Sequence, residues 1–367
     1  MTATDGVART DLPHLWPTTI IRPRCPPLVV YLDLNHWIEL ANAHAGRTDR
    51  DTSAEVLAQI VEAARSDRAV FPLSDTIYIE VGKMANRQYR RELREVMEKI
   101  SRYRVISSRL DIVTHEVETL LDDRVGPSHR PINTLPYLDR GVARAFGMVG
   151  GFRVHDADDE RDVTAQVRAS WRGGPEAFDQ IVLSAEVGLN RSVLDGPATD
   201  EEETELEAVG YDRVGHMAVQ QRRADQENEL VALWNKDGQF RRGRIRDAIS
   251  AREMTIELSD IITRGCMDRG VGTTPILQSR DDIRSACDSM PSTDVSVTLK
   301  ASYHRDPNLL WTPNDIADIA ALASSIPYCD IVVTDKRIAD HANRTGLADR
   351  FGTLIAPRLA EIVDRIA

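Results

Sequence analysis

The sequence predicts an α/β fold with a parallel sheet, interrupted by a large and mainly helical insertion. Short apolar runs rich in β-branched residues alternate with amphipathic segments at both ends of the chain, which is typical of a parallel sheet. Two of these runs, 28–33 and 329–335, each end in an aspartate. Between the two ends, longer polar helical segments replace the alternation. A chain of 367 residues is long enough for two domains, or for one domain with an insertion.

The expected boundaries follow from these changes in character. Residues 1–27 are expected to be a poorly ordered leader, because its five prolines interrupt regular hydrogen bonding. Residues 28–122 form the first part of the α/β domain, and 303–367 form the second part. Residues 123–302 form the helical insertion, which we expect to be an appendage without a sheet of its own.

The elements of the first part are predicted from period-2 and period-3.6 apolar spacing. Ser74 is a good N-cap for a helix that carries Ile77, Val81 and Met84 on one face. The expected order is strand 28–33, helices 34–44 and 54–65, strand 69–73, a helix after Ser74, a charged helix through Ile100, strand 104–107 and helix 109–122.

The insertion contains an acidic stretch, 198–209, that is typical of a solvated helix face or a linker. One long polar helical segment is expected at about 220–264. In the second part, Thr312-Pro313 is a cap followed by a proline at the first helical position. Strand 329–334, helix 336–347 closed by Gly346, strand 352–355 and a terminal helix after Pro357 follow.

Composition excludes several classes of protein. The formal net charge of −12 argues against coating nucleic acid through bulk charge, although a locally basic groove stays compatible with it. The sequence has no apolar run long enough for a membrane span and no apolar signal-peptide core at its start. Four cysteines without a CxxC pair argue against a structural zinc site or a disulfide framework. We therefore expect a cytoplasmic protein without a membrane partner.

Several acidic residues are expected to lie close together at the carboxyl edge of the predicted parallel sheet. Asp33 and Asp335 end two strands, at the edge where such sheets carry their functional crevice. Glu80 and Asp318 lie on helices that reach the same edge, and Asp315 lies one helical turn before Asp318. Clustered carboxylates do not stay ionised together without a counter-charge, which Mg²⁺ or Mn²⁺ supplies through oxygen ligands. Such a site suits hydrolysis of phosphodiesters.

These residues resemble the PIN-domain nuclease family. The resemblance rests on Tyr31-Leu32-Asp33-Leu34-Asn35, on Ser74 with Glu80, and on the stretches 318–323 and 332–336. It implies a three-layer α/β/α domain with a central parallel sheet and a carboxylate-only, divalent-metal site that cleaves RNA. The implied catalytic and metal-binding residues are Asp33, Glu80, Asp318 and Asp335, with Asp315 as a further metal ligand. Thr334 and Asp335 are adjacent, one residue short of the family's Thr-x-Asp, which weakens Asp335 as a direct ligand.

Two other functions compete with that of a metal-dependent ribonuclease. A phosphatase of the haloacid-dehalogenase type needs a second Asp two positions after the first, where this chain has Asn35. A non-catalytic PIN-like module that binds RNA or a partner protein is favoured by the shifted Thr334-Asp335 spacing and by the acidic net charge. A toxin with an inhibitory partner, a defence nuclease and a housekeeping enzyme all fit these residues, and the insertion suits substrate selection or a homo-oligomer contact.

Several other polar residues near the expected site have structural explanations. Asp330 begins the strand that Asp335 ends, about 16 Å away at roughly 3.3 Å per residue, so the two cannot share a metal. His36, His44 and His341 are expected to be structural, and Asn35 either orients a ligand or tightens a turn. Two arginine sets either contact phosphates or lie on solvated faces paired with Glu. They are Arg87, Arg90, Arg91 and Arg94, and Arg241, Arg242, Arg244 and Arg246.

Overall fold

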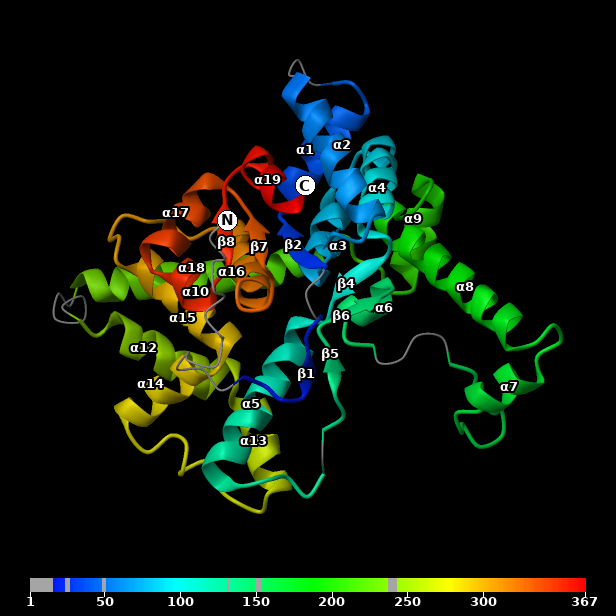
Figure 1. Ribbon diagram of the computed structural model, residues 1–367. Helices are drawn as coiled ribbons and strands as arrows, with labels where there is room; N and C mark the ends of the chain where they lie inside the picture. Colours follow the sequence, from blue (N-terminus) through cyan, green and yellow to red (C-terminus); the bar gives the residue numbers. More distant parts are fainter. Residues whose placement is uncertain (1–15, 24–26, 48–50, 131, 149–152, 237–242) are drawn as a thin grey trace, which may run out of the picture.

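A parallel sheet lies at the centre of the molecule (Figure 1). The computed structural model describes residues 16–23, 27–47, 51–130, 132–148, 153–236 and 243–367. β2 (Leu28–Leu32) and β7 (Ile331–Val333) come from opposite ends of the chain and are neighbours, with Tyr31 opposite Val332. The prediction that these two runs pair is therefore confirmed. The strand order is β3 (Ala69–Val70), β2, β7 and β8 (Leu354–Ala356), all parallel.

Beyond β3, a single residue, Leu73, forms the backbone hydrogen bonds that connect the sheet to the next strand. Leu73 N–H donates to the Arg104 carbonyl at 3.0 Å, and Ile106 N–H donates to the Leu73 carbonyl at 2.8 Å, which places β4 (Arg104–Ile106) alongside. β4 also pairs antiparallel with β6 (Leu138–Arg140). The expected strand 69–73 is thus shorter, but its end still joins the next strand.

The N-terminal segment is partly ordered, which corrects the expectation of a poorly ordered leader for its described residues. β1 (Ile20–Ile21) pairs in parallel with β5 (Leu135–Pro136). Trp16 packs edge-on against Tyr328, with ring centroids 5.8 Å apart. Prolines on either side leave a short stretch whose backbone can still pair. Residues 1–15 and 24–26 lie outside the described residues.

Helices cover both faces of the sheet, because successive strand residues point to opposite sides and both sides are apolar. Val30 and Leu32 of β2 enter one buried cluster, and Val29 and Tyr31 enter another. The first face is covered by α1 (Leu34–His44), α2 (Asp51–Arg65), α3 (Asp75–Lys83), α4 (Arg87–Ser101) and α19 (Val363–Ile366). The second is covered by α15 (Pro291–His304), α16 (Pro313–Ser325), α17 (Lys336–Arg344) and α18 (Leu347–Phe351). A 3₁₀ turn, η3 (Leu359–Glu361), precedes α19.

A third buried cluster lies among helices of the middle of the chain. Helix α15 belongs to two clusters at once, since Val295 and Leu299 face the sheet while Val297 and Ala301 face the helices. The middle segment is therefore no appendage, because it shares its core with the sheet. The helices are α5 (Arg109–Val125), α10 (Gly215–Lys236), α12 (Ile245–Arg252), α13 (Ser259–Asp268) and α14 (Arg280–Ser289), with a π-helical turn, η2 (Glu253–Glu257).

The prediction of a single long helix at about 220–264 is also wrong. α10 ends at Lys236, and α12 starts anew at Ile245. Gly243 just before α12 has φ +102°, a left-handed conformation that a helix cannot contain and that glycine adopts most readily. The π-helical turn then separates α12 from α13.

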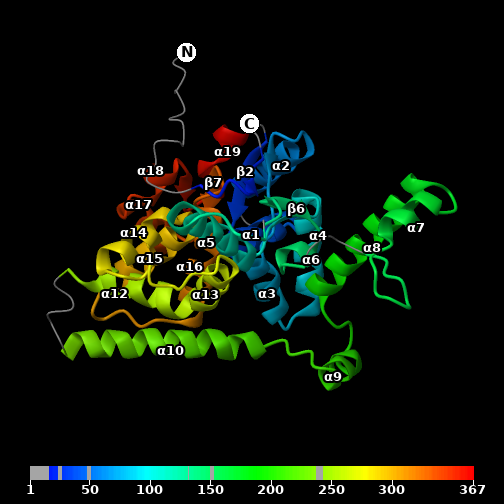
Figure 2. The same cartoon turned by 90° about the horizontal axis from the view of Figure 1, so that it is seen from below.

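A group of helices projects from one side of the molecule (Figures 1 and 2). It consists of α7 (Thr164–Ser170) and α8 (Pro175–Asp195), which follow α6 (Val142–Ala145). Next comes α9 (Asp200–Ala208), the acidic stretch of the sequence, which buries none of its residues. No helix in the described part of the chain is long and apolar enough to cross a membrane.

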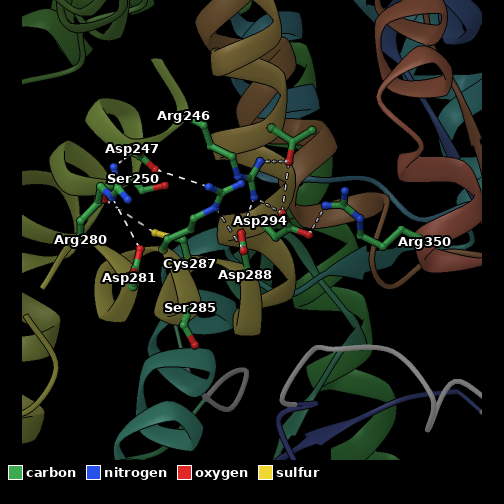
Figure 3. A network of polar contacts seen from close by, with 12 residues as sticks. Arg246, Asp247, Ser250, Arg280, Asp281, Ser285, Cys287, Asp288, Asp294 and Arg350 are labelled. Carbon is green, nitrogen blue, oxygen red and sulfur yellow. Dashed lines mark hydrogen bonds and ion pairs between the residues drawn. The ribbon is translucent and has the colours of Figure 1, made fainter. Parts of the chain in front are cut away.

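An ion-pair network ties the helical cluster to the C-terminal part (Figure 3). Arg246 of α12 donates to Asp294 of α15 at 2.8 Å and to Asp288 of α14 at 2.5 Å. Arg350 of α18 donates to the other oxygen of Asp294 at 2.6 Å. Asp294 is only 1% exposed, so its charge is compensated by two guanidinium groups. Arg246 is thus a structural residue and not a solvated one.

Candidate carboxylate site

Two aspartates meet at the carboxyl edge of the sheet, because β2 and β7 are parallel neighbours. Asp33 directly follows β2, and Asp335 follows β7 after Thr334. Each also caps a helix: Asp33 Oδ1 accepts from Leu34 N–H at 2.7 Å, and Asp335 Oδ1 accepts from Arg337 N–H at 2.8 Å. Helix capping and placement at the functional edge are therefore combined in the same two side chains.

The helices α3 and α16 bring two further carboxylates into this region. Burial raises the pKa of Asp318 to about 8, and the charges of Asp33, Glu80 and Asp335 add to the shift. The pKa of Glu80 is raised to about 7, by burial first and then by Asp33. Four of the predicted residues thus interact electrostatically, although they come from four separate elements.

Asp33 lies at the centre of these interactions. Burial raises its pKa most, while the N–H of Leu34 and the nearby His36 lower it, and the charge of Asp335 raises it further. Thr334 Oγ1 donates to Asp33 Oδ2 at 3.5 Å, which links the ends of the two strands. This hydrogen bond is long, so Oδ2 is held less firmly than Oδ1.

Fewer cations than carboxylates act on this region: Arg337 interacts with Asp335 and His36 with Asp33, and Lys83 interacts with Glu80. Lys83, one turn after Glu80 on α3, lowers the pKa of Glu80. Its Nζ donates to Gln220 of α10 at 3.0 Å, so the ammonium is also tied to another helix. The arrangement therefore gathers more negative than positive charge in a largely buried place, which is costly unless a cation or protons enter.

Asp315 is engaged elsewhere. It forms a capping box with Thr312, whose N–H and Oγ1 donate to Asp315 Oδ2 at 2.8 and 2.7 Å. Its other oxygen pairs with Arg337. Because both oxygens are occupied and the residue is fully buried, we leave Asp315 out of the proposed ligand set. The acid in the first turn satisfies the helix N-terminus instead.

The other polar residues near the site have structural partners or face solvent. Asp330 Oδ2 accepts from Val29 N–H at 2.8 Å, at the opposite end of β2 from Asp33. His341 Nδ1 lies 3.0 Å from Ser302 Oγ. His36 is the exception, because it is buried and neither ring nitrogen has a hydrogen-bond partner among the described residues, although Nδ1 lies 3.6 Å from Glu39. His44 and Asn35 are exposed.

The arginine sets divide in the same way. Arg94 pairs with Asp195 at 2.9 Å and with Glu98 at 3.0 Å. Arg244 and Arg91 are exposed, and Arg241 and Arg242 lie outside the described residues. The cluster around Arg246 therefore cannot be treated as one phosphate-binding face.

Three neighbours of the site were absent from the predicted set. They are Thr334, Lys83 and Tyr31, whose buried hydroxyl has its pKa raised by burial and by Asp33, Glu80 and Asp318. Lys83 has a sequence signal, because it follows Glu80 at i, i+3 on one helix. Tyr31 has no such sequence signal, because an aromatic residue inside an apolar strand is expected to be part of the hydrophobic core.

A cavity elsewhere has no part in this site. It has a volume of about 350 Å³ and lies between α5, α10, α15 and α16. Its charged lining is paired internally: Lys300 donates to Glu253 at 2.7 Å, and Arg252 donates to Glu227 at 2.6 Å. None of the four site carboxylates lines it.

In the described part of the chain, no three Asp, Glu, His or Cys side chains are grouped tightly enough to hold a metal ion. No protein-family model matches the chain, and neither the curated proteins nor the solved structures that were compared give a match. The resemblance to PIN-domain nucleases consequently stays a prediction from the sequence.

Proposed function

We propose that the protein is a Mg²⁺- or Mn²⁺-dependent ribonuclease whose site is formed by Asp33, Glu80, Asp318 and Asp335. One observation carries the proposal: these four carboxylates come from separate elements, and the pKa of Asp318 rises to about 8 through burial and the charges of the other three. Gathering such groups at a sheet edge destabilises the fold. Perturbed carboxylates of this kind concentrate at functional sites.

The donor chemistry fits a hard divalent cation, since the side chains offer only oxygen atoms. No three carboxylates among the described residues are already grouped to hold one ion, so binding of a cation would require these side chains to move closer together. Asp33 and Asp335 each commit Oδ1 to a helix N-terminus, so Oδ2 is the oxygen that each offers to the site. When bound, the cation would supply an activated water and charge stabilisation for the phosphate.

Glu80 and Asp318 would bind and release protons in addition to supplying negative charge. With pKa values of about 7 and 8, both carry protons over part of the neutral range when no cation is present. A cation would displace these protons, so binding should release protons and strengthen as the pH rises. Lys83, next to Glu80, would attract an RNA phosphate toward the edge of the site.

A second candidate is a non-catalytic module that binds RNA or a partner protein. The spread of the carboxylates favours it, because no group of three among the described residues is already assembled for a metal. Titration of Mn²⁺ into the protein by calorimetry separates the two candidates. Binding that Asp318→Asn removes supports the nuclease, and no heat up to millimolar Mn²⁺ supports the binding module.

The activity test uses a labelled single-stranded RNA with Mn²⁺ or Mg²⁺. Asp33→Asn removes the charge but keeps an N-cap, because Asn caps helices as well as Asp. We expect it to lower the cleavage rate by about two to four orders of magnitude. EDTA should reproduce the loss in the wild type, and added Mn²⁺ should reverse it.

Asp340→Asn is the matched control, since Asp340 is an exposed acid on the helix that Asp335 caps. It should cleave as the wild type does. Cleavage that persists in EDTA would exclude the metal-dependent mechanism. If Asp33→Asn loses cleavage activity and its circular-dichroism spectrum shows that it is unfolded, the loss carries no information about catalysis. Asp335→Asn, which also keeps its helix cap, is therefore measured in parallel.

A further inference from the structure

A basic cluster lies beside the carboxylate site, at the start of α4. It consists of Lys83, Arg87, Arg90 and Arg213, and is called here the α4 basic cluster. Arg213 Nη1 donates to the Lys83 carbonyl at 3.2 Å, which joins the segment before α10 to the end of α3. The first turn of α4 has no acid. Arginines at the positive end of a helix are unfavourable unless an anion is near.

Arg90 is the most unusual member of the cluster. The residue is 2% exposed, and its Nε and Nη1 have no hydrogen-bond acceptor among the described residues. Burial lowers its pKa, and the charges of Arg213 and Arg87 lower it further, whereas Tyr211 and Glu203 raise it. Gly196 lies directly against the guanidinium group, at φ +62°, and a Cβ there would come within 2.9 Å of Arg90 Nη1. A buried donor without an acceptor is costly, which indicates a site made for an anion.

The acidic helix α9 covers this cluster in the structure. Asp200 Oδ1 lies 2.6 Å from Arg87 Nη2, and Glu203 Oε2 lies 2.9 Å from the same atom. The second oxygen of Glu203 accepts from Arg213 Nε at 3.1 Å. Since α9 buries none of its residues, it is held on the cluster by these ion pairs and, just before the helix, by the Pro197 carbonyl, which accepts from Arg87 Nε at 3.0 Å. Asp200 is 88% exposed and its ion pair contributes little to stability, whereas Glu203, Arg87 and Arg213 are partly buried. A polyanion with several phosphates would have to replace both of these ion pairs to displace α9.

We infer that the α4 basic cluster binds the phosphate backbone of single-stranded RNA, and that the carboxylates of α9 occupy it when RNA is absent. The identity of the polyanion rests on the proposed function. Lys83 follows Glu80 by three residues on α3, about 4.5 Å along the helix axis, so a strand held by the cluster leads directly to the carboxylate site. Contacts to phosphates position a nucleic acid without selecting its sequence.

The test measures binding of a short fluorescein-labelled RNA by anisotropy, in EDTA so that cleavage does not interfere. Arg87→Ala/Arg213→Ala should weaken binding about 10- to 100-fold at low salt. It should also reduce the slope of log K against log salt by about 1.4, at roughly 0.7 for each phosphate contact. Asp200→Asn/Glu203→Gln should strengthen binding about 3- to 10-fold, because RNA no longer competes with the ion pairs.

The matched control is Glu205→Gln/Glu207→Gln, which makes the same change of charge on the same helix. Both residues are exposed, and neither forms an ion pair with the α4 basic cluster among the described contacts. Measured at physiological salt together with Asp200→Asn/Glu203→Gln, it should change affinity less than about twofold, because charges separated by more than roughly 8 Å are largely screened there. Thermal melts of all variants establish that they are folded.

Each outcome decides the inference. Equal strengthening by the two α9 double variants would reduce the effect to net charge and overturn the role of the ion pairs. Unchanged RNA affinity and salt slope in Arg87→Ala/Arg213→Ala would overturn the cluster as the binding surface, as would binding of inorganic phosphate without binding of RNA. RNA binding that follows the expected pattern in a protein that never cleaves RNA would leave this inference standing and remove the proposed catalysis.

Discussion

Replacing Asp318 by Asn should stabilise the metal-free protein at alkaline pH. In the folded protein the pKa of Asp318 is about 8, against 3.8 in an unfolded chain. The folded state therefore binds the proton more tightly than the unfolded state does. This contribution to stability is fully present below about pH 4 and is lost as the pH rises from there to about 8. Asn is uncharged at every pH, like the protonated Asp side chain. The variant therefore does not lose this stability as the pH rises.

The size of the effect follows from the shift in pKa. A shift from 3.8 to about 8 corresponds to at most about 6 kcal/mol, at roughly 1.4 kcal/mol for each pKa unit. Asp318 is partly exposed, and solvent screens its charge. Glu80 and Asp33 also relax by taking up protons, because the groups titrate together. We therefore expect a gain of about 2 to 3 kcal/mol at pH 8.5 and of less than about 1 kcal/mol at pH 5.

Urea denaturation in EDTA at both pH values measures the gain directly. Asp340→Asn serves as the control, because it removes one charge at an exposed position and should stay within about 0.5 kcal/mol of the wild type. Adding Mn²⁺ at about 100 times its Kd should stabilise the wild type by roughly 2.7 kcal/mol and the variant by much less. Equal gains at pH 5 and pH 8.5, or destabilisation at pH 8.5, would refute the reasoning.

Three further predictions concern the rest of the molecule. Asp294→Ala should lower the free energy of unfolding by about 3 to 5 kcal/mol in urea denaturation, because Arg246 and Arg350 lose the buried carboxylate between them. Gly196→Ala should cost about 1 to 2 kcal/mol and displace the Arg90 guanidinium, owing to its positive φ and the close contact; an unchanged melting temperature would contradict this. Binding of Mn²⁺ should release protons near neutral pH, because Glu80 and Asp318 have raised pKa values, and calorimetry in buffers of different ionisation enthalpy measures the number released.

Local sequence patterns were enough to predict most of the helices and strands and the two acids at the strand ends. The apolar runs before Asp33 and Asp335 formed the neighbouring strands β2 and β7, because a run buried on both faces fits only the interior of a parallel sheet. Helix 34–44 was predicted with its exact bounds, and Thr312-Pro313 opened α16 as expected. These features depend on nearest neighbours in the chain, where periodicity and capping act.

The tertiary structure decided which acids face one another. Asp315 and Asp318 lie one turn apart and are alike in sequence, yet Arg337 from another helix engages Asp315, while Asp318 lies among Asp33, Glu80 and Asp335. In the same way, the packing of α15 between two cores joined the middle of the chain to the sheet. Contacts between residues far apart in the chain set these outcomes, and a periodicity read along one segment carries no information about its partners.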